Sequence, residues 1–274
     1  MELPAHWRDW GLGLELADDV SAADWLADAL RPWSWPDPGG PTRVASFVPD
    51  RYEAFARILH PLRWGTGEGG RWSELAAPRG VTIGPETPFS EAAGLHPGRD
   101  DELWGRYAPS DGSLPAAPMA ALGAALGPHT ATPDACVFCF WVGSGAWGGR
   151  GMRMLDSTLT AAENQAANDR LAARAAHELA AMERIPLVRL PHREHYLFTG
   201  PLARAARPFM LGPWEQSPSM WWPADRSWFV ATEVDGYSSY AGGSQAAIAA
   251  VLASPVLEAL AVTAHTPMDP GPFR

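Results

Sequence analysis

The stretch that decides the fold is Ser217-Pro-Ser-Met-Trp-Trp-Pro-Ala-Asp-Arg-Ser-Trp-Phe-Val-Ala-Thr-Glu-Val-Asp-Gly-Tyr-Ser-Ser-Tyr-Ala-Gly-Gly-Ser244. Residues 227–234 are rich in aromatic and β-branched side chains, which predicts a strand at the centre of a sheet. The glycines in residues 236–243 predict a turn. Ser244 is a suitable N-cap for a helix that spans about residues 244–253.

The segments on either side supply the other predicted elements. Short apolar runs predict strands at residues 44–48 and 136–142, a hairpin of residues 187–190 and 195–199 with a four-residue loop, and an edge strand at residues 257–262. Apolar residues at helical spacing predict helices at residues 21–30, 51–60, 118–126 and 160–184. Residues 61–118 are dense in glycine and proline, and a compact domain rarely contains so long a structureless loop, so we expect short helices there.

These elements predict an α+β fold: a single domain, residues 1–274, with a mixed, mainly antiparallel sheet flanked by helices. Thr160 and Glu163 have the spacing of a capping box at the start of the long helix. Few apolar residues follow them, so we interpret residues 160–184 as a helical insertion. Residues 263–274 contain three prolines and no pattern, which predicts an exposed tail.

Composition excludes several classes of function. The 274 residues include 31 acidic and 21 basic side chains, for a net charge of −10, and every basic residue is arginine. A chain without lysine has neither a Schiff-base lysine nor the lysine of a Walker loop. A negative chain without an arginine cluster is not expected to bind nucleic acid or an anionic membrane. Residues 1–18 show no secretory signal and no apolar run approaches the roughly 18 residues of a membrane helix, so we expect a cytoplasmic protein.

Two motifs, one of glycines and one of cysteines, have the spacing of known binding sites but not the structural context that those sites need. Gly143-Ser-Gly-Ala-Trp-Gly148 matches a dinucleotide-binding fingerprint and follows a predicted strand, but further glycines follow where the helix should begin. Cys136 and Cys139 have the spacing of a redox or zinc half-site. In a strand, however, residues three apart point to opposite faces, so we interpret them as buried, reduced thiols. No cofactor is predicted.

Two further motifs resemble catalytic signatures only in part. His192-Arg-Glu-His195 places its histidines three apart, beside a proline, whereas the zinc protease motifs place two histidines four apart on a helix. Gly242-Gly-Ser-Gln-Ala246 lacks the last glycine of a nucleophile elbow. A convergent metal or acid–base role for His195 stays open, but we predict no metal site.

Glu233 and Asp235 are the strongest candidates for catalysis. Alternation along the predicted strand places both on one face, about 6–7 Å apart. Paired carboxylates at this spacing can serve as general acid and base or bind a divalent cation, with His195 as a further base. They can equally form ion pairs with arginines such as Arg226 or cap the turn at residues 236–243.

The aromatic content predicts a second kind of site. The chain has 14 tryptophans, and aromatic rings with one polar atom provide large contact area for a ligand. We expect Trp141, Trp147, Trp221, Trp222 and Tyr237 to line an aromatic pocket if the loop that contains Trp147 folds next to the double tryptophan.

Several blocks of the sequence resemble a group of uncharacterised actinobacterial proteins. The blocks that carry it include residues 220–235, 240–244, 255–259, 48–57 and 140–143, and the resemblance extends over about half of the chain in separated pieces. This resemblance implies no activity, because none is assigned to that group. From the residues themselves we expect a binding or interaction module that takes a small-molecule ligand or a partner protein. The alternative is a hydrolase-like or metal-assisted enzyme that uses Glu233 and Asp235.

Overall fold

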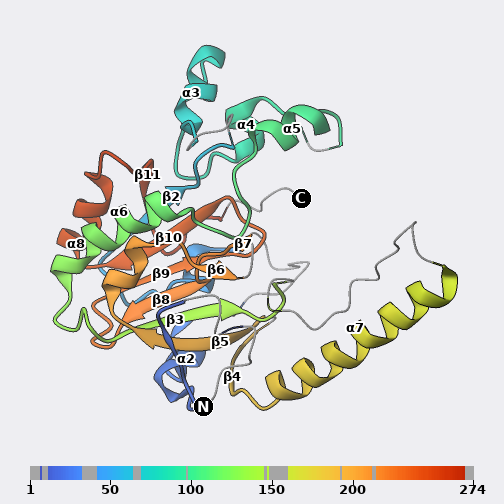
Figure 1. Ribbon diagram of the computed structural model, residues 1–274. Coiled ribbons are helices and arrows are strands. Elements are labelled where there is room, and N and C mark those ends of the chain that lie inside the picture. Colours follow the sequence, from blue (N-terminus) through green and yellow to red (C-terminus); the bar gives the residue numbers. More distant parts are fainter. Residues whose placement is uncertain are drawn as a thin grey trace.

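The stretch quoted above does supply the middle of a sheet. The computed structural model describes residues 7, 12–32, 42–63, 69–96, 98–144, 147, 160–191, 193–211 and 214–268. The main sheet of the described chain has nine strands. Eight of them lie side by side in the order β1 (Glu15–Leu16), β5 (Arg193–Gly200), β3 (Cys136–Trp141), β8 (Met220–Pro223), β9 (Trp228–Thr232), β10 (Ser238–Gly243), β2 (Ala54–Leu59) and β11 (Ala259–Val262). The ninth, β4 (Leu187–Leu190), pairs with β5. The strand pairs recorded in this part of the chain are all antiparallel. The predicted α+β class is confirmed (Figure 1).

The helices surround this sheet. They are α2 (Leu26–Ala29), α3 (Trp72–Ala76), α4 (Phe89–Ala93), α5 (Asp101–Tyr107), α6 (Ala116–Leu126), α7 (Ala161–Met182) and α8 (Gln245–Leu252). Short 3-10 helices occupy Ser21–Ala23, Val44–Ser46, Ala77–Arg79, Gly127–His129 and Leu202–Ala206, and β6 (Met210–Leu211) pairs with β7 (Trp214–Glu215) outside the main sheet. The short helices α3, α4 and α5 lie in the region where the glycine-rich and proline-rich sequence predicts them.

Each face of the sheet has its own core. On one face, Phe138, Trp221 and Val230 pack with apolar residues of α6 and α8. On the other face, Cys139 and Phe229 belong to the core that includes residues of α2 and of the 3-10 helix at Val44–Ser46. Figure 1 shows α6 and α8 together on one side of the sheet and α2 on the other. A third core joins α3, α4 and α5 to the end of β2.

The region before residue 61 differs from the prediction. Val44–Ser46 is a 3-10 helix rather than part of a strand, and Ala54–Leu59 is strand β2 rather than a helix. β2 lies between β10 and β11, with five of its six residues buried. A short apolar run fits both periods, and the pairing with two neighbouring strands decides between them. β11, in contrast, pairs with β2 alone in the described sheet, as expected for an edge strand.

Residues 238–243 form strand β10 instead of the predicted turn. The glycines of this strand are explained by close packing. A Cβ atom on Gly242 would lie 2.7 Å from Cδ2 of Tyr52 and 2.8 Å from Cγ1 of Val48. Glycine inside a strand commonly marks such a close approach. Ser244 then caps α8 as predicted, since its hydroxyl accepts a hydrogen bond from the Ala247 amide.

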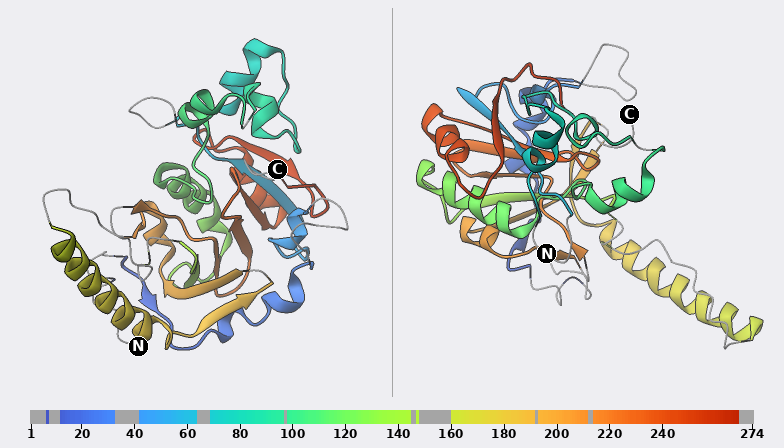
Figure 2. Two further views of the ribbon diagram at one scale, coloured as in Figure 1. Left: turned by 90° about the vertical axis from the view of Figure 1, so that its right-hand side faces the viewer. Right: turned by 90° about the horizontal axis from the view of Figure 1, so that it is seen from above.

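Two features around α7 follow from the sequence. Thr160 and Glu163 make the reciprocal hydrogen bonds of the predicted capping box. Figures 1 and 2 show α7 extending away from the sheet and the other helices. The strands after it form the predicted hairpin, but they pair as far as Leu190 and Arg193, so the connection is shorter than the four residues expected. That the helix is an insertion stays a prediction.

The predicted exposed tail is partly buried. Thr266 and Met268 are each 8% exposed, and the amide of Met268 donates to the carbonyl of Thr42. The amides of Val44 and Ala45 also donate to this segment. These contacts correct the prediction for residues 263–268, whereas residues 269–274 lie outside the described part of the chain.

Cys136 and Cys139 are buried on opposite faces of β3, as the strand period predicts. Burial raises the pKa of the Cys136 thiol to about 12 and that of Cys139 far above its usual range. Because the thiolate is the reactive form, we expect neither thiol to react with a chromogenic disulfide reagent in the native protein. In denaturant both should react, and fast labelling of the native protein would contradict this assignment.

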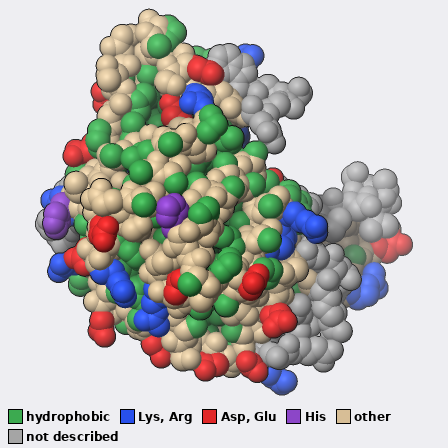
Figure 3. All heavy atoms as spheres, turned by 90° about the vertical axis from the view of Figure 1, so that its left-hand side faces the viewer, with side chains coloured by type: hydrophobic (Ala, Val, Ile, Leu, Met, Phe, Trp, Pro, Cys, Tyr) green, Lys and Arg blue, Asp and Glu red, His purple; other side chains and the backbone are tan. Residues whose placement is uncertain are grey.

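Charged side chains are dispersed on the surface shown in Figure 3, where basic residues are interspersed with acidic ones. Among the described helices, none has both the length and the apolar character to span a bilayer.

Candidate functional site

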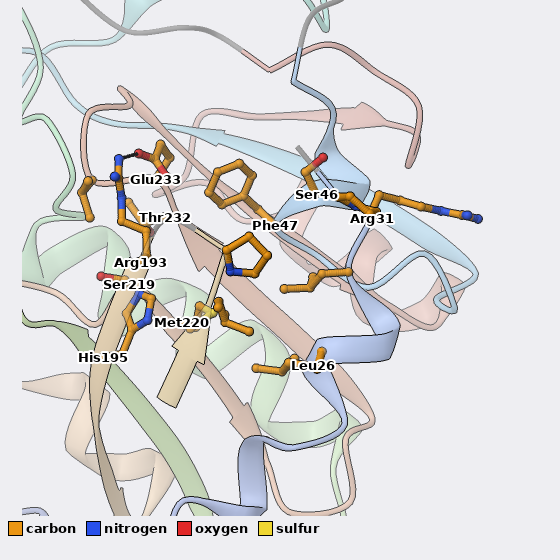
Figure 4. Close-up of a pocket in the computed structure, with 16 residues that line it drawn as sticks. Leu26, Arg31, Ser46, Phe47, Arg193, His195, Ser219, Met220, Thr232 and Glu233 are labelled. Atoms are coloured by element: carbon orange, nitrogen blue, oxygen red, sulfur yellow. Dashed lines mark hydrogen bonds and ion pairs between the residues drawn. The ribbon is translucent and has the colours of Figure 1, made fainter. Parts of the chain in front are cut away.

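A pocket opens where α2 and the residues after it face the ends of four strands. Its volume is about 80 Å³. Its apolar lining residues are Leu26, Ala27, Leu30, Pro32, Phe47, Leu190, Pro191, Met220 and Val234, and its polar ones are Arg31, Ser46, Arg193, His195, Ser219, Thr232 and Glu233. In Figure 4 the labelled polar residues of β5, Arg193 and His195, lie on one wall with Ser219, Thr232 and Glu233, and Leu26, Ser46 and Phe47 lie across from them.

His195 and Ser219 contribute two buried polar atoms to this wall. The residues are 4% and 3% exposed, and neither Nδ1 of His195 nor Oγ of Ser219 has a hydrogen-bond partner among the described residues. Burial, with a smaller contribution from Arg193, lowers the pKa of His195 to about 3. His195 is therefore neutral near pH 7 and offers one donor and one acceptor nitrogen.

The sheet explains why these two residues meet at one pocket. β3 lies between β5 and β8, with His195 paired to Trp141 and the amide of Ser219 donating to the carbonyl of Cys139. Both residues thus flank the same end of β3, one from each side. They are placed by backbone pairing, which is a rigid support for a binding site.

Glu233 and Asp235 share one arginine. Arg193 Nη2 lies 2.6 Å from Oε1 of Glu233 and 3.2 Å from Oδ2 of Asp235. Burial raises the pKa of Glu233, and the guanidinium opposes that shift. The Glu233 side chain is 16% exposed and lines the pocket, whereas Asp235 is 52% exposed and does not.

The relation between these carboxylates differs from the prediction. β9 ends at Thr232, so Glu233 and Asp235 lie in the turn toward β10 and not on one face of a strand. The predicted pairing with an arginine is found, but the partner is Arg193 and not Arg226. The guanidinium also lies 5.5 Å from the ring centroid of Trp141.

The five aromatic residues predicted to form a pocket are separated by the fold. Trp147 and Trp221 are in the core of one sheet face, and Trp222 is in the core of the other. Tyr237 packs with the third core, where its hydroxyl accepts a hydrogen bond from Trp104. Only Trp141 is near the carboxylates, through Arg193. The fold therefore does not bring these five residues together in one aromatic pocket, because most of their rings are buried in separate hydrophobic cores.

Sequence analysis identified Glu233 and His195 but missed the rest of the pocket. In the sequence, Arg193 belongs only to the motif at residues 192–195, and Ser219 only to the stretch before the strand predicted at residues 227–234. Leu26 and Phe47 come from segments more than 140 residues away in sequence. No local pattern could join them, although the conspicuous stretch does provide Ser219, Met220 and Glu233.

The remaining motifs provide no site in the described structure. Ser244 is a helix cap, and the glycine loop after β3 and His192 fall mostly or wholly outside the described residues. Within the described part of the chain, no three His, Cys, Asp or Glu side chains are grouped so that they could hold a metal ion.

Comparison with known proteins adds no family assignment: no protein-family model, curated protein or solved structure matches the chain. The candidate site therefore rests on its geometry.

Proposed function

We propose that the protein binds a small, largely apolar molecule in the pocket between α2 and the ends of β4, β5, β8 and β9. The observation that carries this proposal is the pair of buried polar atoms, His195 Nδ1 and Ser219 Oγ, on the wall of a pocket with a mainly apolar lining. A buried polar group without a partner costs about 1–3 kcal/mol, so a ligand that supplies the missing hydrogen bonds recovers that energy.

The size and composition of the pocket support a small ligand. Its volume of about 80 Å³ exceeds the ~10–15 Å³ that one water-sized probe occupies. Apolar walls with a few convergent polar groups are typical of ligand sites. The enzyme alternative has less support, because Glu233 and Asp235 both bind one arginine and Asp235 is outside the pocket.

Filling the pocket tests this proposal. Ala27 is exposed on α2 and lines the pocket, so we expect Ala27→Trp to fold normally and to block ligand entry. The measurement is ligand-observed NMR with a set of small aromatic alcohols, amines and acids. Fragments that bind the wild-type protein should lose most of their saturation-transfer signal with Ala27→Trp.

Ala22→Trp is the matched control. Ala22 is also exposed, in the 3-10 helix that precedes α2, but does not line the pocket. It should keep the wild-type signals. Equal binding by Ala27→Trp and the wild-type protein would place the fragments elsewhere and contradict the proposed site.

A further inference from the structure

The charges around the pocket indicate the class of its ligand. Arg31 is paired with Asp50, which offsets its charge, and its side chain is 64% exposed. Figure 4 shows its guanidinium pointing away from the pocket. Arg193 is one positive charge shared between the two carboxylates of Glu233 and Asp235. This three-residue group therefore carries one negative charge when both carboxylates are ionised.

An anion is a poor match for this wall. The Arg193 guanidinium is already held by Glu233 at 2.6 Å and Asp235 at 3.2 Å, so an incoming carboxylate would compete with two existing ones. Like charges in close proximity are destabilising, and more so where the site is shielded from water. A cation, in contrast, adds the opposite charge that the group lacks.

The hydrogen-bond acceptors on the pocket wall also match an ammonium group. A primary ammonium has three donors and no acceptor. The pocket wall offers the carboxylate of Glu233, the hydroxyl oxygen of Ser219 and the acceptor nitrogen of the neutral His195. The opposite wall, with Leu26 and Phe47, suits an apolar body.

Resting on the proposed ligand-binding function, we infer that the ligand is a primary amine with a small apolar body, its ammonium group at Glu233. A quaternary ammonium fits less well, since it cannot donate hydrogen bonds and favours a cage of several aromatic rings. Phe47 is the single aromatic residue among those that line the pocket.

Three probes of similar shape separate the head groups: benzylamine, benzyl alcohol and benzoate, which are cationic, neutral and anionic at about pH 7. Titration followed by NMR should show that the wild-type protein binds benzylamine at least about tenfold tighter than benzyl alcohol. Benzoate should bind most weakly. Glu233→Gln keeps the shape of the side chain and should remove the preference for benzylamine, while binding of benzyl alcohol is retained.

Asp235→Asn is the control, because it removes the same charge from the ion-pair group at a residue outside the pocket. It should keep most of the preference for benzylamine. If benzyl alcohol or benzoate binds as well as benzylamine, or if the preference survives in Glu233→Gln, the amine assignment is overturned and the pocket stands. If none of the three probes binds the wild-type protein, the proposed binding function itself fails.

Discussion

Replacing Arg57 with methionine is expected to lower the free energy of unfolding by about 3 kcal/mol or more. Arg57 is fully buried in β2, donates to Oγ of Ser238 at 2.9 Å, and donates to the carbonyls of Pro85 and Thr87 at 3.1 and 2.9 Å. Its guanidinium also lies 5.3 Å from the ring centroid of Trp72. Methionine fills a similar volume but leaves these acceptors without their donor.

Urea unfolding of Arg57→Met measures this loss, with Arg189→Met as the control. Arg189 is a similar side chain on a strand, but it is 77% exposed and makes one ion pair with Glu194 at 3.1 Å. Exposed pairs of this kind contribute about 0–1 kcal/mol. Equal effects of the two substitutions would show that Arg57 does not join the loop at residues 85–87 to the sheet. Arg57→Lys should be intermediate, since it keeps a charge but not the planar fork.

Arg57 also shows why part of the fold could not be predicted. In a helix spanning residues 51–60, an arginine at this position would sit among polar neighbours. In β2 it points into contacts with residues about 30 and 180 positions away. Local periodicity does not contain this information. By contrast, β3 and the caps of α7 and α8 depend on neighbouring residues, and these elements were predicted close to their observed bounds.

The residues of the candidate site also divide into those with a local sequence signal and those brought in from distant segments. Glu233 stood out because two acidic residues interrupt an apolar stretch, which is a local signal. Its partner Arg193 is the first residue of β5, the second strand of the hairpin, and the pocket's opposite wall comes from the first 50 residues. The high tryptophan content led to the prediction of an aromatic pocket, but most of the rings predicted to line it are buried in the hydrophobic cores instead. Trp221 and Trp222 are 2% and 1% exposed in cores on opposite sheet faces.

Acidification from pH 7 to pH 5 is expected to destabilise the protein by roughly 2 kcal/mol for each of two buried histidines. His60 is fully buried, and burial lowers its pKa to about 4, while that of His195 is lowered to about 3. The unfolded chain has ordinary histidines with a pKa near 6.5. Between pH 6.5 and these folded values the unfolded state binds more protons, so stability falls as pH falls. The raised pKa of Glu233 acts in the opposite direction.

Burial is the main reason why His60 stays neutral, and the two hydrogen bonds of the ring are compatible with its neutral form. Its Nδ1–H donates to the carbonyl of Ser110 at 2.8 Å, because a carbonyl can only accept. Nε2 therefore accepts from the hydroxyl of Ser239 at 3.0 Å, and Ser239 in turn accepts from Thr232 at 2.7 Å. A hydroxyl can also accept, and the hydrogen bond to Ser110 favours the charged ring, so the cost of desolvation is what holds the pKa of His60 low.

Urea unfolding at several pH values separates the two histidines. His195→Leu removes one titrating group and the buried nitrogen that has no partner, so its loss of stability from pH 7 to pH 5 should be about half that of the wild-type protein. His265→Gln, at an exposed position, keeps both buried histidines and should follow the wild-type curve. A wild-type stability that stays constant from pH 7 to pH 5 would mean that His60 and His195 take up protons in the folded state as they do in the unfolded chain. In that case His195 would not be a neutral acceptor in the pocket at pH 5.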